Sequence, residues 1–235
     1  MMLFLLGLTG VGKSTAAAAL TRRGYALLPN RRALTDRLII PEVQRAAGET
    51  PHPVEDRLER FALTRRYRQR HPGGMVHALC RYLEANPPGA QPLVFDNLRG
   101  ADEAAAAVAA FPSARFVLLD APPMTRLLRL IGRRDAFDRV AATRLENTGF
   151  VEALLALPGL EAVFDPYELA RLEARGLPEE DLLRAVRILL SEAQNYDMAA
   201  AARVLRAAKD ARGFLHLDTA DKGAEAVQTA IEAWL

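Results

Sequence analysis

"MMLFLLGLTGVGKSTAAAAL", residues 1–20, joins an apolar run to a glycine-rich turn and then to an alanine-rich segment. The run Leu3–Leu6 is too short for a helix and is followed at once by a glycine, which is typical of a buried strand. Alanine is the strongest helix former, so the segment after the turn is predicted to be helical. Between strand and helix, residues 7–14 read GLTGVGKS and match the spacing G-x-x-x-x-G-K-[ST] in full.

This turn, called the glycine loop below (residues 7–14), has the composition of an anion cradle. Its glycines let the backbone bend around an anion, and its amides and the helix N-terminus would point at phosphate oxygens. Lys13 would bridge the outer phosphates and the Ser14 hydroxyl would ligate Mg²⁺. The alternative is a turn that merely packs a helix onto a strand. We predict a site for ATP formed by Gly7, Thr9, Gly10, Val11, Gly12, Lys13, Ser14 and Thr15.

Composition excludes several other classes of protein. The chain has 31 basic and 29 acidic residues and a formal charge of only +2, which makes a nucleic-acid binder unlikely. Cys80 is the only cysteine, so no intramolecular disulfide forms, and the four histidines lack metal-ligand spacing. We expect neither a signal peptide nor a membrane helix, and hence a cytoplasmic protein without membrane contact.

Short apolar runs recur along the chain and alternate with helical patterns. They are bounded by Gly, Pro, Asn or Asp, as strands of a parallel sheet usually are. The pattern predicts a single α/β domain over residues 1–235 with the three-layer P-loop NTPase fold and a five-stranded parallel sheet. The predicted strands are 3–6, 25–28, 92–96, 115–120 and 213–218.

Residues 137–212 lack a strand pattern and contain helix signals instead. Asp165, Pro166 and Glu168 have the order of a capped helix start, and Gly176 would end that helix. A second helix is predicted to begin at Pro178, because acidic residues follow it and favour the positive end of a helix. We predict a helical insertion over residues 150–212, placed before the last strand.

Two segments after predicted strands carry candidate catalytic residues. Asp96 ends the run PLVFD, where a carboxylate would hold Mg²⁺ or a substrate hydroxyl, and Arg99 follows three residues later. Asp96 could instead cap the next turn. If a helix begins near Pro123, three arginines (Arg126, Arg129 and Arg133) share one face and would bind the transferred phosphoryl group. A solvated basic face is the alternative.

The order of these motifs resembles adenylate-kinase-like small-molecule kinases, particularly the archaeal-type dephospho-coenzyme A kinase-like group. The resemblance rests on the glycine loop, on FDNLRG (95–100) and on LLDAPPMTRLLRLIGRR (118–134). It implies that Asp96 and Arg99 match an Asp and an Arg of that group. It also implies that Arg126, Arg129 and Arg133 match the arginines of a mobile lid. Residues 150–212 have no counterpart in the group.

An acceptor site is predicted near the second strand. Asp36 and Arg37 stand near a helix start and would face the cleft, although Thr35 or Asp36 could simply cap that helix. Downstream, a run of arginines with no acidic residue between Arg60 and His71 would bind a phosphorylated acceptor or form a solvated face. These are Arg60, Arg65, Arg66, Arg68 and Arg70.

Three functions are compatible with the sequence. The first is an ATP-dependent kinase that transfers the γ-phosphoryl group to a small acceptor of nucleotide, nucleoside or coenzyme-precursor type, with Lys13, Asp96, Arg99, Arg126 and Arg133 as catalytic residues and Ser14 and Asp96 as metal ligands. The alternative is a P-loop ATPase or nucleotide-dependent binding protein that docks a protein partner through residues 150–212. A nucleic-acid end kinase is the weakest reading.

Overall fold

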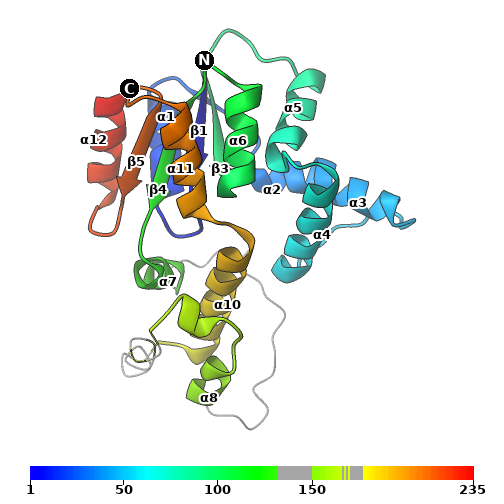
Figure 1. The fold of residues 1–235 in the computed structure, drawn as a ribbon, viewed down its shortest axis with the longest axis vertical. Helices are drawn as coiled ribbons and strands as arrows, with labels where there is room; N and C mark the ends of the chain where they lie inside the picture. The colour runs from blue at the N-terminus through cyan, green and yellow to red at the C-terminus, as the bar shows by residue number, and fades with distance from the viewer. Residues whose placement is uncertain (132–149, 166, 168, 170–176) are drawn as a thin grey trace.

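The chain forms an α/β domain around five parallel strands. The computed structural model describes residues 1–131, 150–165, 167, 169 and 177–235. The strands lie in the order β2-β3-β1-β4-β5, so the first strand is central (Figure 1). Each neighbouring pair is parallel, which confirms the predicted fold class. The strands are β1 (Met2–Leu6), β2 (Ala26–Leu27), β3 (Leu93–Leu98), β4 (Arg115–Asp120) and β5 (Phe214–Asp218).

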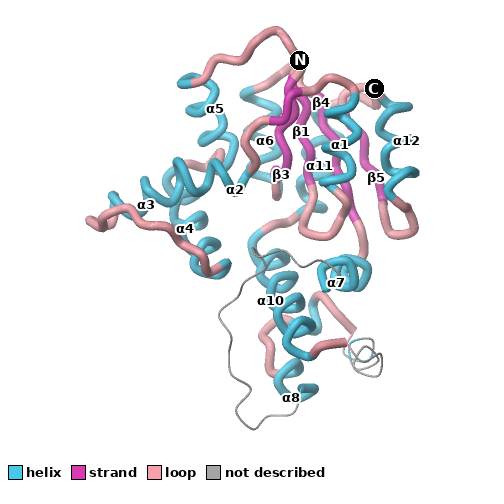
Figure 2. Tube along the Cα trace, turned by 180° about the vertical axis from the view of Figure 1, so that it is seen from behind, coloured by secondary structure: helices cyan, strands magenta, loops and turns pink. Residues whose placement is uncertain are grey.

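Helices cover both faces of the sheet and make three layers (Figure 2). Side chains alternate across a strand, so Leu3 and Leu5 of β1 pack against one face while Phe4 and Leu6 pack against the other. The Leu3 face is covered by α1 (Lys13–Arg22) and α12 (Ala224–Trp234). The Phe4 face is covered by α5 (Met75–Ala85), α6 (Gly100–Ala110) and α11 (Met198–Ala208), and the alanines of α6 and α11 let these two helices approach closely.

A group of short helices follows β2 and leads back to β3. It comprises α2 (Arg31–Leu34), a π-helical turn η1 (Thr35–Ile39), α3 (Ile40–Ala46) and α4 (Arg57–Arg70) before α5. The side chain of Asn30 caps α2 by accepting a hydrogen bond from the Ala33 amide at 2.9 Å. The expectation that Thr35 or Asp36 caps the first helix of this region is therefore wrong, because the helix begins four residues earlier.

Between β4 and β5, the described residues form helices with their own apolar core. These are α7 (Pro123–Ile131), α8 (Phe150–Leu155), a short 3₁₀ turn η3 (Leu160–Ala162) and α10 (Glu179–Asn195). α10 follows Pro178 and begins with three acidic residues, as predicted. The helix predicted to start at Asp165 falls largely outside the described residues. Leucines of α7, α8 and α10 form a core separate from the two that flank the sheet, and Figure 1 shows these three helices below the sheet.

The last helix before β5 belongs to the sheet layers. α11 lies within the region predicted as an insertion, yet it packs on α6 and β5. α10 therefore connects the separate helical core to the main body. Within the part of the chain that the structure describes, none of the helices has the length and apolarity needed to cross a bilayer.

Candidate active site

The glycine loop leaves β1 and ends where α1 begins. Gly10 and Gly12 have φ angles of 87° and 92°, in the left-handed region that disfavours other residues. A Cβ on Gly10 would lie 2.9 Å from the carbonyl oxygen of Arg126, whereas a Cβ on Gly12 would meet nothing within 4 Å. The loop is thus pressed against α7 at Gly10 and opens onto free space at Gly12. The N-terminus of α1 faces that space, and such a terminus attracts anions.

Lys13 lies across this loop and is almost fully buried. Its Nζ donates a hydrogen bond to the Leu8 carbonyl oxygen at 2.6 Å. Burial lowers the pKa of Lys13 from 10.5 to about 7; the charge on Asp96 opposes this shift and that on Arg99 adds to it. An anion beside Lys13 would restore its charge, so the ammonium group would carry its full charge only with a ligand in place.

Asp96 lies near the end of β3, beside Lys13 and Arg99. Its Oδ1 is buried and accepts no hydrogen bond from any residue that the structure describes. Burial raises the pKa of the Asp96 carboxyl, while the charges of Lys13 and Arg99 oppose that rise. A buried oxygen without a partner is costly, so this geometry suits a ligand hydroxyl or a cation.

The donors at this point fit Mg²⁺. A carboxylate and a hydroxyl are hard oxygen ligands, and Mg²⁺ is usually held by one or two such groups together with substrate phosphates and water. Ser14 at the start of α1 and Asp96 line the same cavity. Elsewhere in the described ranges, no cluster of three or more His, Cys, Asp or Glu side chains could hold a metal ion. Ser14 and Asp96 are therefore the residues that would bind it.

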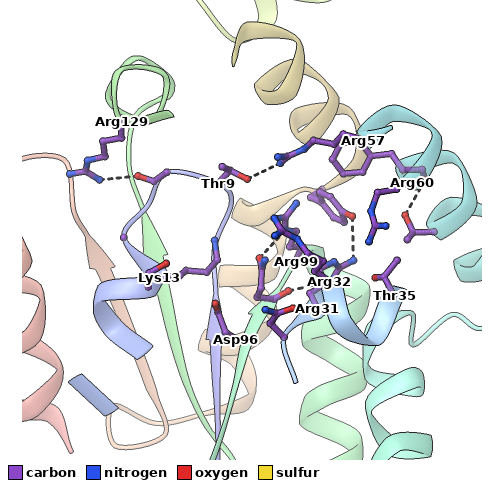
Figure 3. A pocket seen from close by; sticks show the side chains of 18 residues that line it. Thr9, Lys13, Arg31, Arg32, Thr35, Arg57, Arg60, Asp96, Arg99 and Arg129 are labelled. Atoms are coloured by element: carbon purple, nitrogen blue, oxygen red, sulfur yellow. Dashed lines mark hydrogen bonds between the residues drawn. The ribbon is translucent and has the colours of Figure 1, made fainter. Parts of the chain in front are cut away.

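One cavity of about 440 Å³ connects the glycine loop to α2, η1 and α4 (Figure 3). At one end lie Thr9, Gly10, Gly12, Lys13 and Ser14. The other end, called the arginine-lined half below, is formed by Arg31, Arg32, Arg57, Arg60 and Arg99. Asp96 lines the cavity together with both groups. Cations at this density bind anionic groups, because guanidinium groups pair with phosphate or carboxylate oxygens.

Two of these arginines pair with carboxylates, one buried and one exposed. Arg31 pairs with both carboxylate oxygens of Glu103, at 2.6 and 2.9 Å, and this pairing raises the pKa of Arg31 although burial acts against it. Arg60 donates to Asp36 and to the Val54 carbonyl oxygen. Asp36, expected to face the cleft, thus serves as a partner of a cavity arginine.

Aromatic rings line the same half of the cavity. Tyr196 follows α10, and the guanidinium groups of Arg31 and Arg99 each lie 5.4 Å from its ring centre. Phe61 of α4 meets the Tyr196 ring edge-on at 6.3 Å. Both rings line the cavity and offer apolar surface beside the charged groups.

The residues of α7 contact the glycine loop directly. Arg126 Nε donates to the Thr9 carbonyl oxygen at 2.8 Å, and Arg129 donates to the Gly10 carbonyl oxygen at 3.1 Å and to the Thr219 carbonyl oxygen at 2.6 Å. Arg129 lines the cavity, whereas Arg126 lies behind the loop. Arg133 lies outside the described residues. The two described arginines of the predicted lid therefore hold the loop backbone in this structure.

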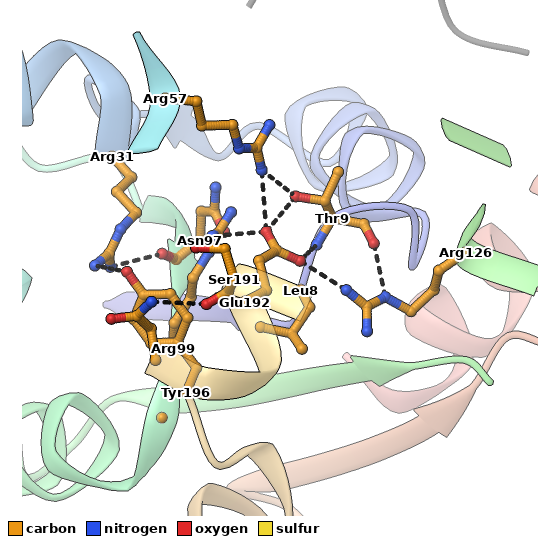
Figure 4. A network of polar contacts seen from close by, with 12 residues as sticks. Leu8, Thr9, Arg31, Arg57, Asn97, Arg99, Arg126, Ser191, Glu192 and Tyr196 are labelled. Carbon is orange, nitrogen blue, oxygen red and sulfur yellow. Dashed lines mark hydrogen bonds and ion pairs between the residues drawn. The ribbon is translucent and has the colours of Figure 1, made fainter. Parts of the chain in front are cut away.

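Glu192 of α10 forms the centre of a polar network beside the loop (Figure 4). Its carboxylate accepts hydrogen bonds from Thr9, Arg57, Arg99 and Arg126, and its side chain is 0% exposed. Burial alone would raise its pKa, but these three guanidinium groups and Thr9 lower it far below the usual range. Sequence reasoning missed Glu192. Its signal is an acidic residue on the buried face of α10, in register with Ala185, Ile188 and Leu189.

The structure brings most of the candidate residues together. Lys13, Ser14, Asp96 and Arg99 all line the cavity with the loop residues Thr9, Gly10 and Gly12. Val11 packs into the core beneath the loop, and neither Gly7 nor Thr15 lines the cavity. Of the arginines predicted to bind an acceptor, Arg60 lines the cavity, while Arg65 and Arg68 donate to Asn195. Arg31, Arg32 and Arg57 were not expected there.

Comparisons with known proteins are sparse. No protein-family profile and no curated protein matches the sequence. Among solved structures, TT1252 from Thermus thermophilus is 20% identical over 100% of this chain and 97% of its own, with a TM-score of 0.45. A likeness of this degree carries no conclusion on activity.

Proposed function

We propose that this protein is an ATP-dependent phosphotransferase that transfers the γ-phosphoryl group to a small, anionic acceptor. The observation that carries the proposal is the single cavity that joins the glycine loop to the arginine-lined half. An enzyme that only hydrolyses a nucleotide needs one phosphate site and a water molecule. A kinase needs a second site, within reach of the first, that orients the acceptor.

The arginine-lined half has the chemistry of an acceptor site. Five arginines lie there. Among the described residues that line either half of the cavity, Asp96 is the only acidic one. An acceptor that carries a phosphate would satisfy these cations, and the rings of Phe61 and Tyr196 would contact an apolar or planar part of it. The proposal therefore favours a phosphorylated acceptor of nucleotide or coenzyme-precursor type over an uncharged one.

The charged and hydroxyl side chains nearest the glycine loop then have defined roles. Lys13 and Arg99 would neutralise the charge that spreads over the transferred group. Ser14 and Asp96 would bind Mg²⁺, which supplies further neutralisation of phosphate charge when it is present. The unpartnered Oδ1 of Asp96 could equally accept the hydrogen bond of the acceptor hydroxyl and orient it.

The test is ADP release measured with and without added acceptors. A panel of phosphorylated nucleosides and coenzyme precursors is first screened by thermal shift in the presence of ADP and Mg²⁺, because ligands of the native state raise the melting temperature. We expect turnover only with an acceptor that also shifts the melting temperature. Turnover that is equally fast without any acceptor would contradict the kinase proposal and favour the ATPase.

Two variants control this assay. Lys13→Ala removes the loop cation and should lower turnover about 100-fold or more. Lys222→Ala removes a lysine from the exposed turn before α12 and should leave turnover unchanged. Equal activity of the wild type and Lys13→Ala would show that the measured turnover does not come from this site.

A further inference from the structure

Glu192 links the helical region between β4 and β5 to the glycine loop, and no motif in the sequence accounts for it. It lies 183 residues after Thr9 in the chain. Its Oε1 accepts from the Thr9 hydroxyl at 2.5 Å, from Arg57 at 3.1 Å and from Arg99 at 2.8 Å. Its Oε2 accepts from the Thr9 amide at 3.0 Å and from Arg126 at 2.6 Å. One carboxylate thus contacts four residues from separate segments (Figure 4).

Every polar group of Thr9 is bound by this arrangement. The amide and the hydroxyl donate to Glu192, and the carbonyl oxygen accepts from Arg126. The first half of the glycine loop is therefore held by side chains that lie outside the loop motif. Hydrogen bonds to charged groups are stronger than neutral ones, so this contact restricts the peptide planes on both sides of Thr9.

The same carboxylate also holds two cations of the cavity. Arg57 from α4 and Arg99 from the turn after β3 line the cavity, whereas Glu192 does not. Three guanidinium groups around one carboxylate leave a positive excess, and two of them, Arg57 and Arg99, line the cavity. Without the carboxylate these groups would repel one another and adopt other positions.

The position of Glu192 is fixed by the apolar core of its helix. α10 buries Leu182, Val186 and Leu189 against the helical core that α7 shares, and Glu192 continues that buried face by one turn. A helix packed over four turns places its side chains more precisely than a loop does. The helical region is thereby coupled to the loop through a rigid element.

We propose that Glu192 is a positioning residue, which sets the conformation of the glycine loop at Thr9 and aims Arg57 and Arg99 into the cavity. The helical region between β4 and β5 then has a role in the site, since it carries the carboxylate that organises the loop. The bearing on catalysis rests on the proposed kinase function. The proposed effect of Glu192 on the conformation of the glycine loop does not rest on that function, and it can be tested without measuring turnover.

The first test measures amide hydrogen exchange of the unliganded protein by NMR. Glu192→Asp keeps the charge that compensates the arginines but withdraws the carboxylate by one methylene group. We expect the Thr9 amide to lose protection about tenfold or more, while amides of β1 and of the middle of α10 keep theirs. Thr9 protection equal to that of the wild type, in both Glu192→Asp and Glu192→Gln, would overturn the proposal.

Glu103→Gln is the matched control. Glu103 is also a buried carboxylate that holds a cavity arginine, Arg31, but it has no contact with Thr9 among the described hydrogen bonds. A loss of stability common to both sites would lower the melting temperature of both variants. Only the Glu192 variants should lose exchange protection at the Thr9 amide. An equal loss of protection in Glu103→Gln would show that Glu192 only stabilises the fold in general.

The second test separates binding from turnover. Glu192→Gln makes the cluster more positive, so pyrophosphate should bind to it as tightly as to the wild type or more tightly. Turnover should nevertheless fall about tenfold or more, because Arg57, Arg99 and the loop are no longer aligned. Unchanged turnover in Glu192→Gln would contradict a positioning role in catalysis. If the wild type turns over no acceptor, the kinase proposal fails, and the exchange experiment still decides on Glu192.

Discussion

Lys13 offers a quantitative test of the unliganded site. Its pKa of about 7 means that, at pH 8.5, the amine is about 97% neutral in the free protein. A polyphosphate bound beside it favours the charged form. If binding returns the pKa to its ordinary value of 10.5, the lysine becomes almost fully protonated at the same pH. Binding at pH 8.5 should therefore take up about one proton from the solution.

The energy involved is large enough to measure. The gap between a pKa of 10.5 and one of about 7 corresponds to roughly 5 kcal/mol of differential interaction. The bound state holds more protons than the free state between these two values, so affinity should fall as the pH rises. The expected slope is about tenfold per pH unit across that window.

Isothermal titration with ADP, in two buffers of different ionisation enthalpy, gives the number of protons directly. A pH of 8.5 lies well above the last pKa of the ADP phosphates, so the ligand is almost fully ionised and proton uptake reports on the protein. Lys13→Met should abolish the uptake, and Lys222→Met, at an exposed position, should keep it. Tight binding by the wild type without proton uptake would refute the reasoning, because Lys13 would then hold the same charge in both states.

Three further variants test other parts of the site. Gly10→Ala places a methyl group 2.9 Å from a backbone carbonyl oxygen of α7, at a residue whose φ is 87°. Pyrophosphate affinity, measured by calorimetry, should therefore fall about tenfold or more. The control is Gly89→Ala, where a Cβ meets nothing within 4 Å, and this variant should bind pyrophosphate normally. Leu189→Ala opens a cavity between α10 and α7 and should lower the free energy of unfolding by about 2–5 kcal/mol in urea, whereas exposed Leu155→Ala should change it by less than about 0.5 kcal/mol. Asp96→Asn removes the charged oxygen that would bind Mg²⁺, so Mg²⁺ should no longer strengthen ADP binding in a thermal-shift titration; an unchanged Mg²⁺ effect would place the metal elsewhere.

The part of the site that could be predicted lies within short segments of sequence. The glycine loop lies between a strand and a helix, all within 20 consecutive residues, so its geometry follows from local rules. Asp96 lies near the end of β3 and Arg99 directly follows that strand, and the carboxyl ends of parallel strands meet at one edge of the sheet. These residues lie on the cavity because local structure and sheet topology suffice to put them there.

The remaining residues depend on packing between distant segments. Arg57 lies at the start of α4, and only the tertiary arrangement of that helix brings it near Thr9 at 3.0 Å. Glu192 belongs to a helix whose pattern predicts a buried face, but the pattern does not say what that face covers at its end. The expected lid arginines show the same effect, since the packing of α7 on the loop turns Arg126 toward a carbonyl oxygen and Glu192.

The charge around the cavity differs from the net charge of the whole chain. Basic and acidic residues are nearly balanced over the whole chain, with a formal charge of +2. In the cavity, seven basic side chains and one acidic one face the same space. Glu103, Glu192 and Asp36 offset part of that charge from behind, and each of them pairs with an arginine of the cavity. The acidic partners hold the arginines in place without occupying the cavity, so a positive excess remains for a ligand. A ligand with several negative charges, such as a polyphosphate with a phosphorylated acceptor, would neutralise this positive excess, whereas an uncharged acceptor would leave the excess uncompensated.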